Sequence, residues 1–194
     1  MIRPIRYYGD PVLRRTARPV ISFDEELERL TADMVETMHD DSGVGLAAPQ
    51  VGEPLRLFVA SECNRDEEGE LVQIADHVFV NPTIVERGGT QLAPEGCLSV
   101  PGLYVDQLER DLRVMVRFQD VTGHPRELRA EGHFAQVIQH EYDHLEGILF
   151  FDRLPDDQRR SFLEEHRAEL AQLQRDAKAR LKELRTLRTE KSRP

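Results

Sequence analysis

The stretch QHEYDHLEG, residues 139–147, constrains this chain more than any other part of it. Its two histidines, His140 and His144, are four residues apart, so in a helix they lie one turn apart on the same face and can bind one metal ion. Glu141 directly follows the first histidine and would lie beside that ion, where it can exchange protons. A catalytic site of this kind usually has three protein ligands and one open position, so a third ligand must come from elsewhere.

The residues around this motif indicate that its helix is buried. Apolar side chains are spread widely around the helix axis: Phe134, Val137, Ile138, Tyr142 and Leu145. A helix that is apolar on most sides is usually buried, and Gly147 stands where a C-terminal cap belongs. Buried polar groups need partners, and a metal is an efficient partner for two neutral imidazoles. The alternative is a pair of core histidines with ordinary hydrogen bonds.

The remaining sequence patterns predict an α+β fold. Asp10 and Pro11 predict a short helical turn, and Ser22 with Glu25 forms a capping-box pattern that begins a helix over 22–40. Other segments are expected in this order: a strand at 55–60, a polar loop at 64–70, strands within 77–89 interrupted at Pro82, a β-hairpin at 111–132, and one long amphipathic helix from 156. We therefore expect mainly antiparallel sheets around a central metal-binding helix, with a long C-terminal helix.

Composition narrows the class of protein. The 194 residues carry a formal net charge of −10, so a general nucleic-acid binder and a DNA partner are not expected. We see no apolar run long enough to span a bilayer and no secretory leader, so we expect a cytoplasmic protein without a membrane partner. Two cysteines do not make a disulfide scaffold; Cys63 is interpreted as an ordinary small side chain, which leaves Cys97 as a free thiol.

Cys97 is the best candidate for the third metal ligand. It follows a glycine in the turn-rich segment APEGCLSVPG (93–102), between strands. A histidine six residues after the motif, as in metzincin-like proteases, is excluded because position 150 is Phe150. A later glutamate, as in thermolysin-like proteases, could be supplied only by a helix that we interpret as charged and solvated: Glu164, Glu165 or Glu169. One thiolate with two imidazoles suits Zn²⁺, Fe²⁺, Co²⁺ or Ni²⁺.

Three segments together resemble the signature motifs of the peptide deformylases: GVGLAAPQ (43–50), EGCLS (95–99) and QHEYDH (139–144). They occur in that family's order, and the resemblance to the bacterial type extends from YGDPVLRR through GILFFDRL, over most of residues 4–154. It implies a catalytic domain at 1–154, followed by a basic amphipathic helix at 155–194. It also implies a metal-dependent hydrolase that removes the N-formyl group from the formylmethionine of newly synthesised polypeptides and releases formate.

The resemblance also implies a role for individual residues. Three would bind one divalent metal, with Fe²⁺ expected ahead of Zn²⁺, Ni²⁺ or Co²⁺: Cys97, His140 and His144. Glu141 would be the general base and acid while a metal-bound hydroxide attacks the formyl carbon. Two groups would stabilise the developing oxyanion: Gln50 and the backbone N–H of Leu98. Three would hold the peptide, which can add as a strand to bare glycine backbone: Gly43, Val44 and Gly45.

Several neighbouring residues are expected to support the ligands through hydrogen bonds: Glu95, Ser99, Gln139 and Asp143. Gln136 stands where many members of the family have arginine, so an ion pair is not expected there. His133 lies two turns before His140 on the same face, and we interpret it as a cap or surface residue rather than part of a pocket.

The C-terminal segment differs in charge from the rest of the chain. Residues 171–194 hold eight Lys or Arg against three Asp or Glu. Such a basic helix could make a salt-sensitive contact with ribosomal RNA near the emerging chain, or it could pack on its own domain through its leucines, which we favour. Two other functions compete with deformylation: a metallopeptidase that cleaves internal peptide bonds, and a non-catalytic, ribosome-associated binding module.

Overall fold

The computed structural model describes residues 1–65, 68 and 71–191. Most of the polar loop expected at 64–70 lies outside these residues. The helical elements are η1 (Pro11–Arg14), α1 (Glu25–Asp40), η2 (Ala48–Val51), α2 (Gly132–Leu145), η3 (Phe150–Arg153), α3 (Asp156–Glu165) and α4 (Arg167–Lys191). The strands are β1 (Gly45–Ala47), β2 (Leu57–Arg65), β3 (Leu71–Gly88), β4 (Gln91–Gly96), β5 (Tyr104–Arg110), β6 (Arg113–Gln119) and β7 (Pro125–Glu131).

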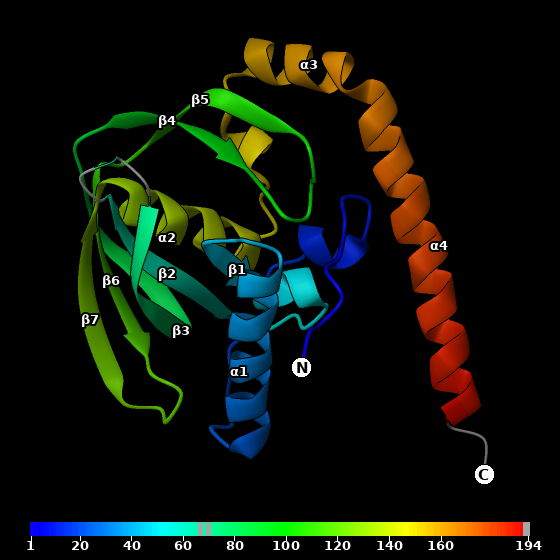
Figure 1. Ribbon diagram of the computed structural model, residues 1–194, viewed down its shortest axis with the longest axis horizontal. Helices are drawn as coiled ribbons and strands as arrows, with labels where there is room; N and C mark the ends of the chain where they lie inside the picture. The colour runs from blue at the N-terminus through cyan, green and yellow to red at the C-terminus, as the bar shows by residue number, and fades with distance from the viewer. Residues whose placement is uncertain (66–67, 69–70, 192–194) are drawn as a thin grey trace.

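The strands form two antiparallel sheets with α2 between them (Figure 1). The larger sheet has the order β1-β2-β3-β6-β7, and β4 and β5 pair with each other. The hairpin predicted at 111–132 is confirmed as β6 and β7, whose register runs from Arg113 opposite Glu131 to Gln119 opposite Pro125. The expected α+β class, with a central helix and mainly antiparallel strands, is therefore confirmed.

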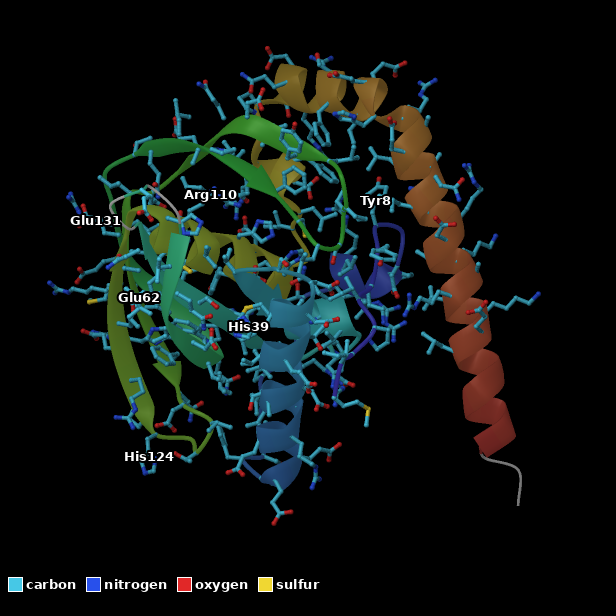
Figure 2. The ribbon with its side chains drawn as sticks, in the orientation of Figure 1. Tyr8, His39, Glu62, Arg110, His124 and Glu131 are labelled. Atoms are coloured by element: carbon cyan, nitrogen blue, oxygen red, sulfur yellow. The ribbon has the colours of Figure 1, made fainter. Side chains whose placement is uncertain are left out.

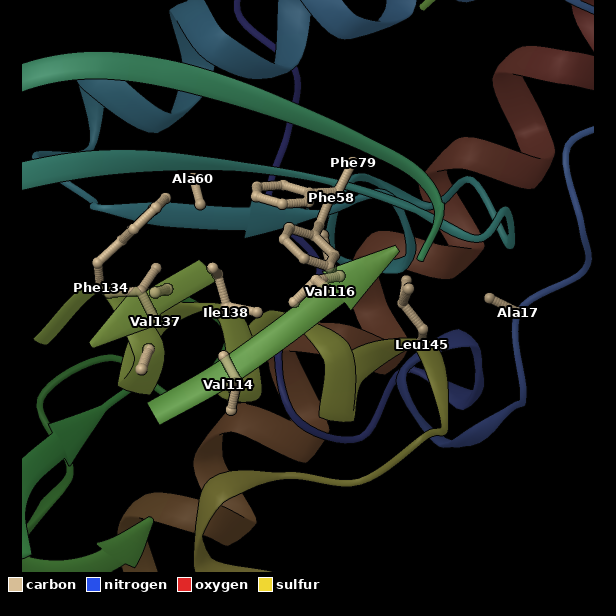
Figure 3. Packing of buried hydrophobic residues seen from close by; sticks show 13 residues of the cluster. Ala17, Phe58, Ala60, Phe79, Val114, Val116, Phe134, Val137, Ile138 and Leu145 are labelled. Carbon is tan, nitrogen blue, oxygen red and sulfur yellow. The ribbon is translucent and has the colours of Figure 1, made fainter. Parts of the chain in front are cut away.

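One face of α2 packs on the large sheet. Phe58 of β2 and Phe79 of β3 stack with ring centroids 4.6 Å apart. Phe134 and Ile138 of α2 belong to the same buried cluster, and Figure 3 shows the α2 side chains meeting those of the strands. Burying one such side chain contributes about 1.5–3 kcal/mol, so the cluster holds α2 firmly. The opposite face of α2 carries the polar side chains of the 140–144 motif.

Strand β3 is continuous, so the interruption predicted at Pro82 is wrong. The register between β3 and β6 instead shifts between Val80 and Thr83, and Asn81 adopts a left-handed φ of 50°. A proline cannot donate to a ladder of backbone hydrogen bonds, and such a bulge accommodates it without ending the strand.

Helix α1 begins at a different cap from the one predicted. Asp24, not Ser22, is the N-cap, and its carboxylate accepts from the backbone N–H groups of Glu26 and Leu27, each at 3.1 Å. The helix buries four apolar side chains: Leu27, Leu30, Met34 and Met38. After the C-terminal end of α2, Gly147 has the left-handed φ of 72° expected of a residue that follows a helix.

The C-terminal region is two helices rather than one. The chain bends at His166, whose ring contacts Phe162 with centroids 4.6 Å apart, and α4 leaves α3 in a new direction (Figure 1). The bend lets Phe162 of α3 and Leu170 of α4 pack in one cluster with Phe150 and Phe151. Helix α4 then runs beside the N-terminal segment. The two come so close that a Cβ added to Gly9 would lie 2.7 Å from the Cα of Gln174. No helix among the described residues is long and apolar enough to cross a membrane.

Candidate metal centre and active site

The two sheets and α2 bring the three predicted ligands together. His140 and His144 lie one turn apart on α2, and their ring centroids are 5.0 Å apart. Cys97 follows β4, and its Sγ lies 3.2 Å from Nε2 of His144. One donor atom from each residue falls within a group no wider than 4.8 Å, and both imidazoles are buried. Among the described residues this is the one group of three or more His, Cys, Asp or Glu side chains that could hold a metal.

The turn after β4 directs the sulfur of Cys97 toward α2. The N–H of Val100 donates to the carbonyl of Cys97 at 2.9 Å, which closes the turn. The N–H of Ser99 and Nε2 of Gln50 then approach Sγ at 3.4 Å and 3.5 Å. Both N–H groups therefore point at the sulfur, the atom through which a cysteine binds a metal.

The orientation of His140 also fits a metal site. Its Nδ1 donates to Oε1 of Glu95 at 2.7 Å, which leaves Nε2 as the ring nitrogen available to the cluster. A carboxylate behind a histidine in this way fixes the ring and its tautomer. One sulfur and two nitrogens in this arrangement fit a divalent ion with one open coordination position.

Glu141 lies in the same buried region. Its side chain is 3% exposed, and its Oε2 has no hydrogen-bond partner among the described residues. Burial raises the pKa of this carboxyl to about 7, against a smaller opposing effect from the charge of His140. A carboxyl whose pKa is near neutrality can both accept and return a proton, which is what a general base and acid must do.

The buried strand β1 explains the need for a glycine at position 45. A Cβ on Gly45 would collide with Oε1 of Glu141, so only a glycine leaves room for this carboxylate. Gly45 is itself buried and paired with Ala60 of β2, whereas Gly43 and Val44 are half-buried and line the pocket. Position 45 therefore makes room for Glu141 through its lack of a side chain.

Gln50 and Leu98 both lie close to the sulfur. Oε1 of Gln50 accepts from the N–H of Ala47 at 2.7 Å, which fixes the amide so that Nε2 points at Ser99 Oγ (3.2 Å) and at the sulfur of Cys97. The N–H of Leu98 has no acceptor among the described residues, so it can donate to a bound molecule. Both residues line one pocket with Glu141 and His140.

A buried ion network supports the ligand helix from β5. Arg110 donates to both oxygens of Glu95, at 3.0 Å and 2.6 Å, and to Asp143 at 2.7 Å. Figure 2 shows Arg110 between the β4–β5 pair and α2. Burial alone would raise the pKa of Glu95, but hydrogen bonds and charges from His140 and Arg110 outweigh it and lower that pKa to about 2. Glu95 is therefore ionised when it accepts from His140.

Arg110 belongs to no motif, and sequence reasoning missed it. The signal that could have found it is position: the buried residues of β5 are Val105, Leu108 and Arg110, so the arginine follows the apolar face of the strand. A cation at such a position must pair with buried anions. Its partners, Glu95 and Asp143, come from β4 and α2, and only the tertiary fold brings them together.

Of the other two residues expected to support the ligands, one contacts the metal-ligand group and one does not. Ser99 contacts both Gln50 and Cys97, whereas Gln139 points away from the cluster and bonds to the backbone of Asp111 at 3.1 Å and 2.9 Å. Gln136 forms no ion pair; its Nε2 donates to Pro94 O at 2.9 Å and to the ionised carboxylate of Glu95 at 3.3 Å.

The cluster opens into a cavity of about 590 Å³. Its lining includes Gly43, Val44 and Gly45, together with the end of β4 and the turn after it. His133 also lines this cavity, contrary to the interpretation of that residue as a cap or surface side chain. The size suits a few residues of a peptide rather than a folded substrate.

An α+β fold with a Cys-His-His group beside a buried glutamate defines a class, the metal-dependent hydrolases. Comparison with known proteins is more specific. Residues 2–160 match the family model described as polypeptide deformylase. The peptide deformylase of Thermus thermophilus is 53% identical over 190 residues, which cover 95% of this chain and 98% of that protein. The chain belongs to the polypeptide deformylase family, a family of metal-dependent enzymes.

Solved structures agree with this assignment. The crystal structure of a peptide deformylase from Thermus thermophilus matches with a TM-score of 0.82 and 50% identity, over 91% of this chain and 99% of that one. A class I type b peptide deformylase from Acinetobacter baumannii, solved with Met-Ala-Ser bound, matches with a TM-score of 0.74 and 34% identity, over 79% and 99%.

The metallopeptidase alternative loses its support on two grounds. The family is that of the deformylases, and the glutamates considered as third ligands are exposed on α3 and α4, outside the Cys97 cluster: Glu164, Glu165 and Glu169. The binding-module alternative is likewise disfavoured, because the relatives are named as enzymes.

Proposed function

We propose that this protein hydrolyses the formamide bond of N-terminal formylmethionine on nascent polypeptides and releases formate. One observation carries this proposal: the buried Glu141 lies beside the Cys97, His140 and His144 group at a peptide-sized cavity, in a chain of the deformylase family. Because such substrates arise during protein synthesis, we place the activity in the cytoplasm.

The donor set supports one divalent ion, held by Cys97, His140 and His144, and we propose Fe²⁺, with Zn²⁺, Ni²⁺ and Co²⁺ as ions that the same donors accept. When bound, such an ion acts as a Lewis acid and makes water nucleophilic at neutral pH. Glu95 holds the His140 ring, and Arg110 holds Glu95 in turn, so the ligand does not need to reorient when the ion binds.

Glu141 transfers the proton from the water to the leaving amine. Its carboxylate takes a proton from the attacking water and returns it to the nitrogen of methionine, which leaves as an amine when the C–N bond breaks. The pKa of about 7 suits both transfers, since the group is neither a very weak base nor a very weak acid near neutral pH. Its free Oε2 is available to the water, while Gly45 leaves the space that the carboxylate occupies.

Two donors face the oxyanion that develops on the formyl oxygen. Nε2 of Gln50 is held in place by the bond between its Oε1 and Ala47, and the N–H of Leu98 is unengaged among the described residues. Preorganised donors in a water-poor site each contribute about 3–4 kcal/mol in other acyl-transfer enzymes.

The peptide chain would bind as an added strand. Gly43 and Val44, which are half-buried, and Gly96 at the end of β4, which is exposed, all line the cavity. The Acinetobacter baumannii protein holds Met-Ala-Ser, a peptide that this cavity can also accommodate. Main-chain hydrogen bonds tolerate any sequence, which suits an enzyme that acts on many nascent chains.

The direct test compares three substrates with the metal-loaded protein. We expect formate from formyl-Met-Ala-Ser, little hydrolysis of acetyl-Met-Ala-Ser, whose methyl group crowds the reacting carbon, and no cleavage of casein. Cleavage of casein without formate release would favour a metallopeptidase instead.

The first part of α4 packs on the rest of the protein, where Leu170 and Ala177 are buried, in line with the packing that we favoured from the sequence. We also propose that the exposed basic side chains of this helix contact the ribosome. Exposed cations lie along α4 at Arg175, Lys178 and Lys182, and Figure 1 shows this helix at the edge of the molecule. Such a contact depends on salt, because it releases counterions from RNA. The test is co-sedimentation with ribosomes at two salt concentrations, with and without residues 175–194; equal co-sedimentation of the two proteins would contradict the proposal.

A further inference from the structure

A second hollow adjoins the active-site cavity. It has a volume of about 830 Å³ and lies between β5 and α3. We call it the β5–α3 groove, and its main lining residues are Tyr104, Val105, Asp106, Asp157, Phe162 and Glu165. Gly102 and Tyr104 line both this groove and the active-site cavity, so the two hollows meet at the turn before β5.

The junction between the hollows is open. A Cβ on Gly102 would meet no atom within 4 Å. Tyr104 is 64% exposed and lines both hollows, so its ring is available to a bound chain at the junction. A polypeptide held in the cavity can therefore continue over Gly102 into the groove, with the exposed Tyr104 beside it.

The outer edge of β5 is free to pair. Among the described residues β5 pairs with β4 alone, so the N–H and C=O groups on its other edge, which lines the groove, are unengaged. A free edge of this kind accepts an extended chain as a further strand. Such pairing recognises main chain, as an enzyme for diverse nascent chains requires.

The groove has an apolar floor and an acidic rim. Val105 and Phe162 are buried beneath it, whereas Asp106, Asp157 and Glu165 are exposed. No lysine or arginine is among its lining residues, and His166 is the one basic side chain there. Three carboxylates without a neighbouring cation in the groove attract a positively charged chain and repel a negative one.

We propose that the β5–α3 groove binds the part of the nascent polypeptide that follows the first few residues, and that it favours lysine and arginine there. This inference rests on the proposed deformylase function, since it gives the same substrate a second contact region. The active-site cavity contacts only the formylmethionine and its immediate neighbours. The groove thus adds a preference for lysine and arginine further along the nascent chain.

The test uses the metal-loaded, full-length protein and three formylated peptides. The first is formyl-Met-Ala-Ser; the other two extend it by a Gly-Ser spacer that ends in either Lys-Lys or Glu-Glu. We expect kcat/KM for the lysine peptide to exceed that for the glutamate peptide by about three- to tenfold at low salt, since exposed charge contacts are individually weak. High salt should remove the difference, while the tripeptide should not respond to salt in this way.

Variants of the acidic residues test whether the groove causes the preference for the lysine peptide. Asp106→Asn with Glu165→Gln should reduce the preference for lysine about threefold or more and leave tripeptide hydrolysis unchanged. Glu164→Gln with Glu169→Gln is the matched control, because it also removes two exposed carboxylates, and neither residue lines the groove. If this control has the same effect as Asp106→Asn with Glu165→Gln, general charge rather than the groove is responsible, and the proposal is wrong.

The outcomes separate this inference from the function on which it rests. If the tripeptide is hydrolysed but neither length nor charge alters kcat/KM, the groove does not bind substrate and the deformylase function stands. If the tripeptide is not hydrolysed, the proposed function fails. Binding of fluorescent Met-Ala-Ser peptides with the same lysine or glutamate ends would then still decide whether the groove takes a basic chain.

Discussion

The carboxylate of Glu141 occupies the space that any side chain at position 45 would need. A Cβ on Gly45 collides with Oε1 of Glu141, although the two residues lie on different elements, β1 and α2. The GVGLAAPQ segment, which we propose offers backbone to the peptide, therefore also limits where the carboxylate of Glu141 can lie. This relationship connects two of the three sequence motifs physically.

Gly45→Ala should displace Glu141 while leaving the metal ligands in place. A shift of about 1 Å in a catalytic group can cost roughly 10²-fold in rate, so we expect that loss in kcat with metal content unchanged. Gly88→Ala is the control, because a Cβ there meets no atom within 4 Å. Steady-state kinetics with metal analysis checks this, and full activity of Gly45→Ala would show that the glutamate does not need its position.

Arg110→Met should be strongly destabilising. It removes the buried partner of Glu95 and leaves Asp143 with only the partly exposed Arg153 among the described residues, and breaking a buried pair costs about 3–5 kcal/mol. The free energy of unfolding from denaturant titration measures this. Arg113→Met, at an exposed pair whose atoms are 3.9 Å apart, should cost at most about 1 kcal/mol. Equal costs for the two variants would contradict the importance of the buried network.

Cys97→Ala should lose most of its bound metal, because two imidazoles on one helix turn hold a divalent ion less tightly than a complete set of three donors. Cys63→Ala should keep it, since that thiol lies on β2 outside the cluster. Metal analysis after desalting compares the two variants. Removing the metal from the wild type with a chelator should also lower its melting temperature, as expected when a ligand binds only the folded state.

Asp76 should contribute to stability in a pH-dependent way. Burial opposes its ionisation, but hydrogen bonds from Ser61 and His39 outweigh burial and lower the pKa of Asp76 below its ordinary 3.8. Its contribution is therefore present above pH 3.8 and is lost as the pH falls through the lowered folded-state pKa. Unfolding curves of wild type and Asp76→Asn should converge at low pH, and a constant difference at all pH values would be inconsistent with this pairing.

Local spacing was enough to predict the metal-binding helix and its two histidines. His140 and His144 are brought together by one turn of a helix, so their proximity depends on few other residues. The position of Cys97 depends on a turn that directs its sulfur toward α2, and its own segment does not predict that contact. The resemblance of all three motifs supported the choice of Cys97 as a ligand. The confirmed hairpin of β6 and β7 likewise depends on alternation and a turn within one segment.

The features that were missed depend on contacts between distant segments. Arg110 is explained only by two carboxylates from other elements, and the bend at His166 depends on burying Phe162 and Leu170 in one cluster. Pro82 was expected to interrupt a strand, but a register shift against β6 accommodates it. Local propensity cannot predict such effects, because tertiary packing decides them.

The most direct test of the proposed mechanism is formate release from formyl-Met-Ala-Ser by the wild type and by Glu141→Gln, at equal metal content under anaerobic conditions. Glutamine keeps the size of the side chain but cannot accept the proton. We predict formate from the wild type and a loss of about 10²–10⁴-fold in kcat for the variant. A Glu141→Gln protein as active as the wild type would contradict the role of Glu141, and no formate from the metallated wild type would contradict the proposed function itself.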